Sequence, residues 1–201
     1  KQDIAGSIAH ARMLGRQGIL SDTDVEHIEV GLLEIEHQID QGKFKWNIND
    51  EDIHMAVESE LIEDIGAAGA RLHTGRSRND QVLLDLKLFT RHALQEVVDD
   101  VRKLFDVLLA RSNELKDVLM PGYTHLQIAM PSSFGLWFGA YAESLADDML
   151  FLQAAYRMTN RNPLGSAAGY GSSFPLDRAM TTRLLGFDSM DYNVVYAQMG
   201  R

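Results

Sequence analysis

The sequence of 201 residues contains no cysteine and only four prolines. The lack of cysteine excludes disulfide bonds and thiolate chemistry, and the scarcity of proline leaves room for long uninterrupted helices. No apolar stretch approaches the ~20 residues that a membrane-spanning helix needs, and no signal peptide opens the chain. We therefore expect a cytoplasmic protein that has no membrane partner.

The sequence also has few basic residues relative to acidic ones, and its net charge is -10. This balance argues against a protein that grips nucleic acid or an anionic membrane surface non-specifically. It leaves local anion sites open, since two or three arginines in a cleft can dominate the field there. The hydrophobic content of 45% and charged content of 24% are typical of a globular protein with a real core.

Long segments with helical periodicity dominate the chain and predict an all-α fold. In one segment, the apolar residues return to the same face over nearly forty residues, which corresponds to roughly 60 Å of helix. They are Val82, Leu86, Phe89, Leu94, Val97, Val101, Leu104, Leu108, Leu115 and Leu119. So long an apolar face needs several neighbours, so we expect a bundle of very long helices shared between subunits.

The domain prediction is a small N-terminal helical domain, of which residues 1–76 are part, followed by the first part of a central helical bundle in residues 77–201. Within the first region, Asn49 and Asp50 are predicted to open a helix that carries Asp52 and His54 in its first turn. The helix dipole alone explains an acid there, and a histidine in such a place is usually a satisfied surface residue.

The stretch LHTGRSRNDQ, residues 72–81, brings two arginines into one loop just before the longest helix. Asn79 and Asp80 are good N-cap residues, and a helix N-terminus favours an anion. Arg76 and Arg78 add planar donors that match a carboxylate. The pattern indicates a site for a small carboxylate, and the alternative is that the arginines pair with nearby acids and fix the loop.

A second cluster, Thr124-His125, is predicted to lie in a loop between two long helices. A histidine can take or orient a proton near neutral pH, and the neighbouring hydroxyl can bind a carboxylate oxygen. The alternative is a histidine whose ring caps a helix carbonyl. Carboxylate recognition combined with an acid/base group is what proton abstraction beside a carboxylate needs.

Five stretches of the sequence resemble the argininosuccinate lyase/δ-crystallin family of the fumarase/aspartase superfamily. LHTGRSRNDQVLLDLKLF is similar to its first signature region and PGYTHLQ to its second; TGRSRNDQ is the more specific of the two. The runs NDEDIH, NPLGS and FPLDR also fit, so that the resemblance covers essentially the whole chain.

The resemblance implies an all-helical homotetramer whose active sites are each assembled from three subunits. The implied reaction is reversible β-elimination of argininosuccinate to arginine and fumarate, without metal or organic cofactor. By position, Arg78, Asn79 and Thr124 correspond to substrate-binding residues and His125 to the catalytic-site histidine. Asp52 and His54 correspond to an acid and a histidine that flank the cleft.

Two departures from the family pattern stand out. Ile128-Ala129-Met130 follow the second signature where most members have a basic residue and Gln-Pro. The third signature region, which carries the catalytic serine, has no counterpart, so we expect a fragment that is inactive alone. Two alternatives stay open: another fumarate-releasing lyase such as an adenylosuccinate lyase-like enzyme, and a non-catalytic, crystallin-like structural protein.

Overall fold

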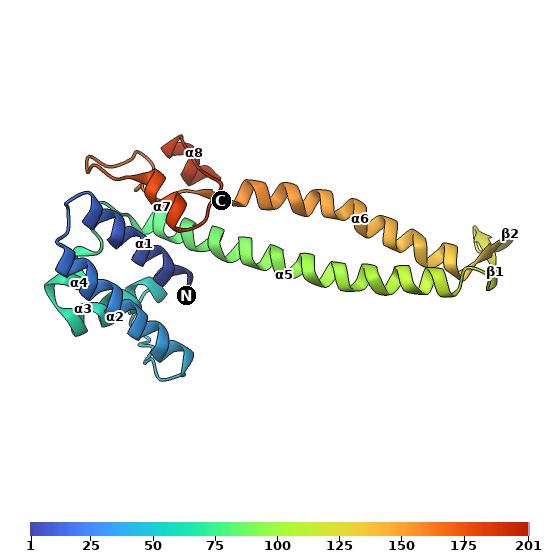
Figure 1. The fold of residues 1–201 in the computed structure, drawn as a ribbon, viewed down its shortest axis with the longest axis horizontal. Helices are drawn as coiled ribbons and strands as arrows, with labels where there is room; N and C mark the ends of the chain where they lie inside the picture. Colours follow the sequence, from blue (N-terminus) through green and yellow to red (C-terminus); the bar gives the residue numbers. More distant parts are fainter. Residues whose placement is uncertain (201) are drawn as a thin grey trace. The chain divides into compact units, whose positions relative to one another are not determined.

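The computed structural model describes residues 1–200, and the fold is all-α, as predicted (Figure 1). Two pairs of short strands interrupt the helices. The helices are α1 (Gln2–Arg16), α2 (Asp22–Asp40), α3 (Ile53–Ile65), α4 (Ala67–Arg71), α5 (Arg78–Glu114), α6 (Phe134–Thr159), α7 (Arg178–Leu184) and α8 (Val194–Met199). The strands are β1 (Leu119–Thr124), β2 (Gln127–Ser133), β3 (Arg161–Asn162) and β4 (Ser189–Met190). Among the described residues, no helix is both long enough and apolar enough to cross a membrane.

The chain forms two compact units. The first combines residues 1–89 with the described residues from Asn160 onward, and the second consists of residues 90–159. Helix α5 contributes its first turns to the first unit and its remainder to the second. The predicted domain boundary after residue 76 stays a prediction about the whole protein.

The core of the first unit lies where α1, α2 and α3 meet, and Figure 1 shows these helices with α4 at the blue-to-cyan end of the chain. Ile28 and Leu61 are completely buried there, and burying such a side chain stabilises the fold by about 1.5–3 kcal/mol. Gly31 permits this packing, because a Cβ at that position would lie 2.6 Å from Cδ1 of Leu61. Helix α2 starts after its N-cap Ser21, whose hydroxyl accepts from the Asp24 N–H.

The prediction that Asn49 and Asp50 open the third helix was wrong by about one turn. Helix α3 begins at Ile53, and Asp52 is its N-cap, with Oδ1 accepting from the Met55 N–H at 2.7 Å. The short helix α4 was not predicted at all. Gly69 allows it to pack closely, since a Cβ there would lie 2.9 Å from the backbone oxygen of Leu61.

The longest helix, α5, has 37 residues and confirms the prediction of one very long helix. Its N-cap, however, is Ser77 and neither Asn79 nor Asp80. The Ser77 hydroxyl accepts from the Asn79 N–H, and the Asp80 carboxylate accepts from the Ser77 N–H at 2.9 Å. These two bonds resemble a capping box, and the first turn that they fix holds the partly buried Arg78 and the exposed Asn79.

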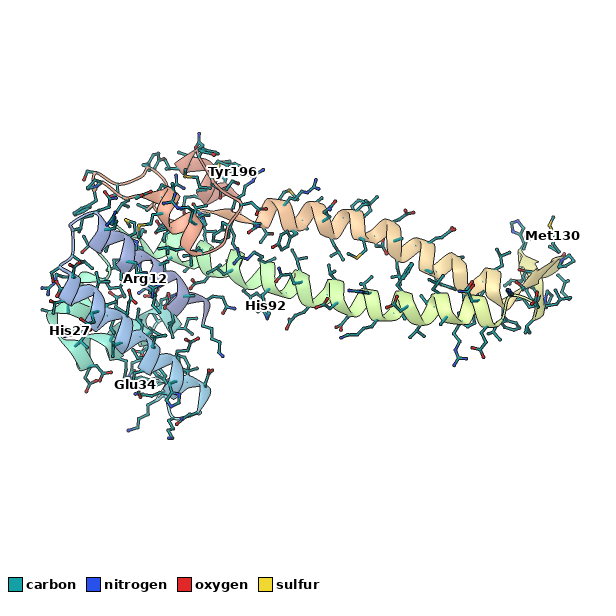
Figure 2. The ribbon with its side chains drawn as sticks, in the orientation of Figure 1. Arg12, His27, Glu34, His92, Met130 and Tyr196 are labelled. Carbon is teal, nitrogen blue, oxygen red and sulfur yellow. The ribbon has the colours of Figure 1, made fainter. Side chains whose placement is uncertain are left out.

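A β-hairpin follows α5 where the sequence predicted a loop. Strands β1 and β2 pair with Thr124 opposite Gln127, so that His125 and Leu126 form a two-residue turn. The Met130 side chain projects from β2 and is 73% exposed (Figure 2). The turn lacks the Asn-Gly type of signature that identifies hairpins from sequence, which explains why it was missed.

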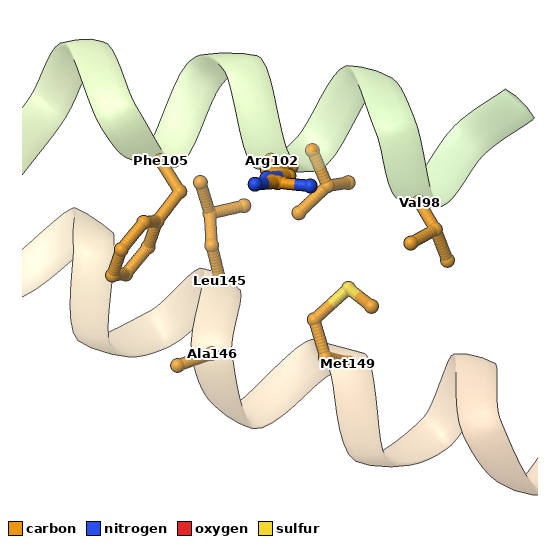
Figure 3. A pocket seen from close by; sticks show the side chains of 7 residues that line it. Val98, Arg102, Phe105, Leu145, Ala146 and Met149 are labelled. Carbon is orange, nitrogen blue, oxygen red and sulfur yellow. The ribbon is translucent and has the colours of Figure 1, made fainter.

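Helix α6 begins after Ser133, whose hydroxyl accepts from the Leu136 N–H. Its aromatic residues Trp137 and Tyr141 remain about half exposed in this chain. Between α5 and α6 lies a groove of about 360 Å³, into which Phe105, Leu145 and Met149 project (Figure 3). The second unit thus leaves much apolar surface uncovered.

Candidate functional site

Arg78 is held by acceptors from two helices of the first unit. Its Nη1 donates to Oε1 of Gln81 at 2.8 Å, and its Nη2 donates to Oε2 of Glu58 at 3.3 Å. Its Nε lies 3.6 Å from Oδ2 of Asp52. The guanidinium remains about one-third exposed, and the neighbouring Asn79 is exposed. The first turn of α5 therefore presents a fixed cation and an amide at a helix N-terminus, which suits an anion.

Arg76, the other arginine of the loop, has a structural place. Its side chain is buried, and Nη1 donates to the Ser7 hydroxyl of α1 at 2.9 Å. Burial lowers its pKa, whereas the charges of Asp3 and Glu58 act in the opposite direction. For Arg76 the structure supports the interpretation that the arginine fixes the loop, through its bond to Ser7 and the charges of Asp3 and Glu58 nearby.

Asp52 and His54 both lie at the start of α3 but in different surroundings. Asp52 caps the helix and reaches toward Arg78. His54 was expected to be a surface histidine, and this was wrong, because only 6% of the residue is exposed. Its Nδ1 lies 3.0 Å from Oδ1 of Asp3 and 3.2 Å from Oδ2 of Asp85.

The pKa values of Asp3, His54 and Asp85 are shifted in different directions within their buried cluster. Burial alone would raise the pKa of Asp3, but the bonds from His54 and Gln81 and the charge of Arg76 hold it below the usual value. Burial alone would lower the pKa of His54, and the two carboxylates raise it instead. Burial and the charge of Asp3 raise the pKa of Asp85 to about 7. Asp3 therefore stays ionised to a lower pH than usual and His54 keeps its proton to a higher pH, while Asp85 takes up a proton near pH 7.

The same three residues have possible metal-ligand atoms that lie within 4.8 Å of one another, which is close enough to hold one metal ion. The local charge argues for a proton in place of a metal. Arg76 already provides a buried positive charge beside Asp3, and the raised pKa values of Asp85 and His54 favour a proton on each of these two groups. A divalent ion would have to displace these protons and would add charge to a buried site, and burying excess charge is costly.

Thr124 and His125 lie in the second unit, at the hairpin turn, and both are exposed. His125 has φ 48° and Leu126 has φ 65°, values that a type I′ turn requires and that glycine or asparagine usually supplies. Non-glycine residues held in this region cost on the order of 1–3 kcal/mol each, and such strain clusters at functional sites. The structure brings Asp52, Arg78 and Asn79 together, whereas Thr124 and His125 belong to the other unit.

Several polar residues around Arg78 were missed by the sequence analysis. Glu58 joins Arg78 to His73, whose Nδ1 lies 3.6 Å away, and the hydrogen bond with His73 lowers the pKa of Glu58. Gln81 and Asp3 connect Arg78 to the buried cluster. The available signal was that Asp3, Gln81 and Asp85 interrupt apolar helix faces, but partners 78 residues apart are invisible to local spacing.

A family model described as Lyase matches residues 1–195. The chain therefore belongs to this lyase family.

The similar proteins are more specific. The chain is 65% identical over 201 residues to "Argininosuccinate lyase" of Phocaeicola vulgatus, and 46% identical over 199 residues to the protein of that name from Laribacter hongkongensis. The first alignment covers 100% of this chain and 45% of the Phocaeicola protein. The second covers 99% of this chain and 43% of the Laribacter protein. A solved structure of EDDS lyase in complex with formate aligns with a TM-score of 0.88 at 30% identity. That alignment covers 99% of this chain and 39% of EDDS lyase. The resemblance to argininosuccinate lyases is confirmed, and the chain spans under half the length of these relatives.

Proposed function

We propose that the protein containing this chain is an argininosuccinate lyase, which splits argininosuccinate reversibly into arginine and fumarate in arginine biosynthesis. The observation that carries the proposal is the 65% identity, over all 201 residues, to a protein of that name. Because the chain spans 45% of that relative, we expect these residues to be inactive alone.

In this proposal the exposed first turn of α5 binds a carboxylate group of the substrate. Arg78 contributes the charge and the planar donors, Asn79 contributes an amide, and the helix N-terminus adds its partial positive charge. Thr124 donates to a carboxylate from the hairpin turn. What supports this assignment is that solvent reaches all four groups that the resemblance identifies: Asn79, Thr124 and His125 are exposed, and the Arg78 side chain is about one-third exposed.

The proposed chemistry is removal of a proton from the carbon beside a carboxylate. The electron pair of that C–H bond forms the double bond of fumarate while the C–N bond breaks, and its electrons leave with the nitrogen of arginine. Negative charge builds on the carboxylate oxygens, which Arg78 and Thr124 stabilise. His125 supports proton transfer, and the family's serine base belongs to the third signature, which this chain lacks. The scheme needs no metal or organic cofactor.

The proposal includes a homotetramer with active sites shared between subunits. Its support is the uncovered apolar surface of the second unit, where Leu136 and Phe151 on α6 are at least 70% exposed. Large apolar side chains that stay this exposed along a helix are typical of a face that another subunit covers. Light scattering on the full-length protein should give a tetramer, and a stable, active monomer would contradict this part. A cytoplasmic location stays a prediction.

The first test is a substrate panel on the full-length protein, followed by the absorbance of released fumarate. Argininosuccinate should be the preferred substrate. Preference for adenylosuccinate would support the other fumarate-releasing lyase. The 30% identity to EDDS lyase adds EDDS to the panel. An intact tetramer that acts on none of the three would support the crystallin-like structural protein.

A second test replaces Arg78 by lysine, which keeps the charge but loses the planar set of donors. We expect kcat/KM to fall by the equivalent of about 2–4 kcal/mol. The control is Arg183→Lys, at an exposed position on α7 of the same unit. Unchanged kinetics in Arg78→Lys would leave Arg78 with only the role of fixing its loop.

A further inference from the structure

A continuous path of polar contacts connects the exposed Arg78 with the buried cluster beneath it. Arg78 donates to Oε1 of Gln81 at 2.8 Å, and Nε2 of Gln81 donates to Oδ1 of Asp3 at 2.6 Å. Oδ1 of Asp3 in turn lies 3.0 Å from Nδ1 of His54. The path runs from α5 through α1 to α3, entirely within the first unit.

The chemistry of the partners fixes the orientation of the Gln81 amide. A guanidinium has only donors, so the amide oxygen must face Arg78. The Asp3 carboxylate is ionised and has only acceptors, so the amide nitrogen must face Asp3. With 2% of Gln81 exposed, water cannot substitute for either partner. The amide therefore has one favourable orientation, with its oxygen toward Arg78 and its nitrogen toward the charged Asp3 carboxylate.

We propose that Gln81 is a positioning residue for Arg78, and that the buried Asp3 carboxylate, held by His54, orients Gln81 for this task. This inference rests on the proposed function and deepens it, because it identifies what keeps the carboxylate-binding arginine in its place. Gln81 itself does not touch the substrate. Its effect on the reaction passes through the direction in which the Arg78 guanidinium points.

The other contacts of Arg78 are weaker than the one to Gln81. Glu58 accepts at 3.3 Å and Asp52 lies at 3.6 Å, and both are partly exposed, so solvent screens them. The Gln81 contact is shorter and its acceptor is buried. Loss of Gln81 should therefore let Arg78 turn toward the two acids, away from the orientation that a substrate carboxylate requires.

The experiment replaces Gln81 by methionine, which has a similar volume but no amide, in the full-length protein. The matched control is Gln95→Met, which removes an exposed glutamine from the same helix. We expect KM for argininosuccinate to rise about 10-fold in Gln81→Met while kcat changes by less than about 3-fold, because a misplaced arginine weakens binding. A purely structural defect would lower the active fraction, and hence kcat, without this change in KM.

A second measurement does not depend on lyase activity. Modification of arginines by phenylglyoxal is followed peptide by peptide with mass spectrometry. The rate at Arg78 should change at least about 3-fold in Gln81→Met, and the rate at the exposed Arg183 should not. If the wild-type protein has no lyase activity but the Arg78 rate changes, the proposed function fails and the positioning role stands. Unchanged KM together with an unchanged Arg78 rate would overturn the positioning role.

If Gln81→Met fails to fold, Gln81→Glu provides a second test of the positioning role of Gln81. A glutamate keeps the acceptor for Arg78 but cannot donate to Asp3 unless it is protonated. The charged groups around this path are Asp3, Asp52, His54, Glu58, Arg76, Arg78 and Asp85. We expect the KM of Gln81→Glu to exceed that of the wild type at about pH 8 and to return toward it by about pH 6, where the buried carboxyl takes up a proton. A KM ratio that equals one throughout would overturn the proposal.

Discussion

The carboxylate of Asp80 and the backbone N–H of Gly165 are joined by a hydrogen bond of 2.9 Å across 85 residues of sequence. The same oxygen, Oδ2, accepts from the Ala167 N–H at 2.8 Å, while Oδ1 accepts from the Ser77 N–H at 2.9 Å. One buried side chain thus completes the cap of α5 and fastens the NPLGS loop to it. The position of Arg78, two residues earlier, depends on this connection.

Asp80→Asn tests that connection. An asparagine replaces one acceptor oxygen by an NH2 group, which cannot accept from the backbone donors. We expect a loss of about 2–4 kcal/mol in the free energy of unfolding, since the hydrogen bonds are buried and charge-assisted. Urea unfolding of the full-length protein measures this loss. The control is Asp106→Asn, an exposed position on the same helix, and equal stability of the two variants would contradict the prediction.

The buried His10 should make the free energy of unfolding depend on pH. Its ring is buried, and Nε2 donates to the Thr74 carbonyl at 2.9 Å. Burial, followed by the charge of Arg76, lowers its pKa from 6.5 to about 3. Between these values the unfolded state binds a proton that the folded state rejects, so stability falls as the pH drops below 6.5. The contribution of His10 should fall by about 2 kcal/mol between pH 7 and pH 5.

The measurement is urea unfolding at several pH values for the wild type and His10→Gln. A glutamine can still donate to the Thr74 carbonyl but does not titrate. Its stability should depend less steeply on pH in the acidic range, by about 1 kcal/mol per pH unit. His92→Gln, at an exposed position of α5, should keep the wild-type slope. If both variants had the wild-type slope, His10 would not be the neutral, buried group described above.

Gly135 allows α6 to start against the last turns of α5 in the second unit. A Cβ at this position would lie 2.5 Å from the Ser112 carbonyl oxygen and 2.5 Å from Cα of Lys116, and both atoms are backbone. Gly135→Ala should therefore cost at least about 2 kcal/mol of stability. Gly139→Ala, one turn further along, meets only the Ser112 hydroxyl at 3.2 Å and should change stability by less than about 1 kcal/mol. Thermal unfolding of the two variants measures the difference. Similar melting temperatures would show that the close approach of α5 does not require a glycine at position 135.

His125→Asn tests the proposed acid/base role. An asparagine keeps hydrogen-bonding ability and tolerates positive φ, but it cannot accept a proton near neutral pH. We expect kcat for fumarate release to fall roughly 10²-fold or more, with a smaller change in KM. Steady-state assays on a folded, full-length tetramer measure this, with His27→Asn at an exposed position of α2 as the control. An unchanged kcat with a weaker KM would make His125 a binding residue.

Local sequence patterns were sufficient for the large elements of this protein. Periodic apolar residues predict α5, and Ser21 and Ser133, which stand before α2 and α6, are of the residue type that marks helix starts. These signals are local, because a helix face and its cap are set by residues within a few positions of each other. The specific run TGRSRNDQ similarly identified the family from contiguous residues.

Only the tertiary structure decided which polar residues work together. The sequence could not show that Arg76 is buried against Ser7, that His54 lies between Asp3 and Asp85, or that Gln81 joins Arg78 to Asp3. These pairings depend on how α1 and α3 dock on the start of α5, across separations of up to 78 residues. Spacing along one helix fixes which face a side chain occupies, whereas the free energy of a buried charge depends on the partners that other helices bring to it.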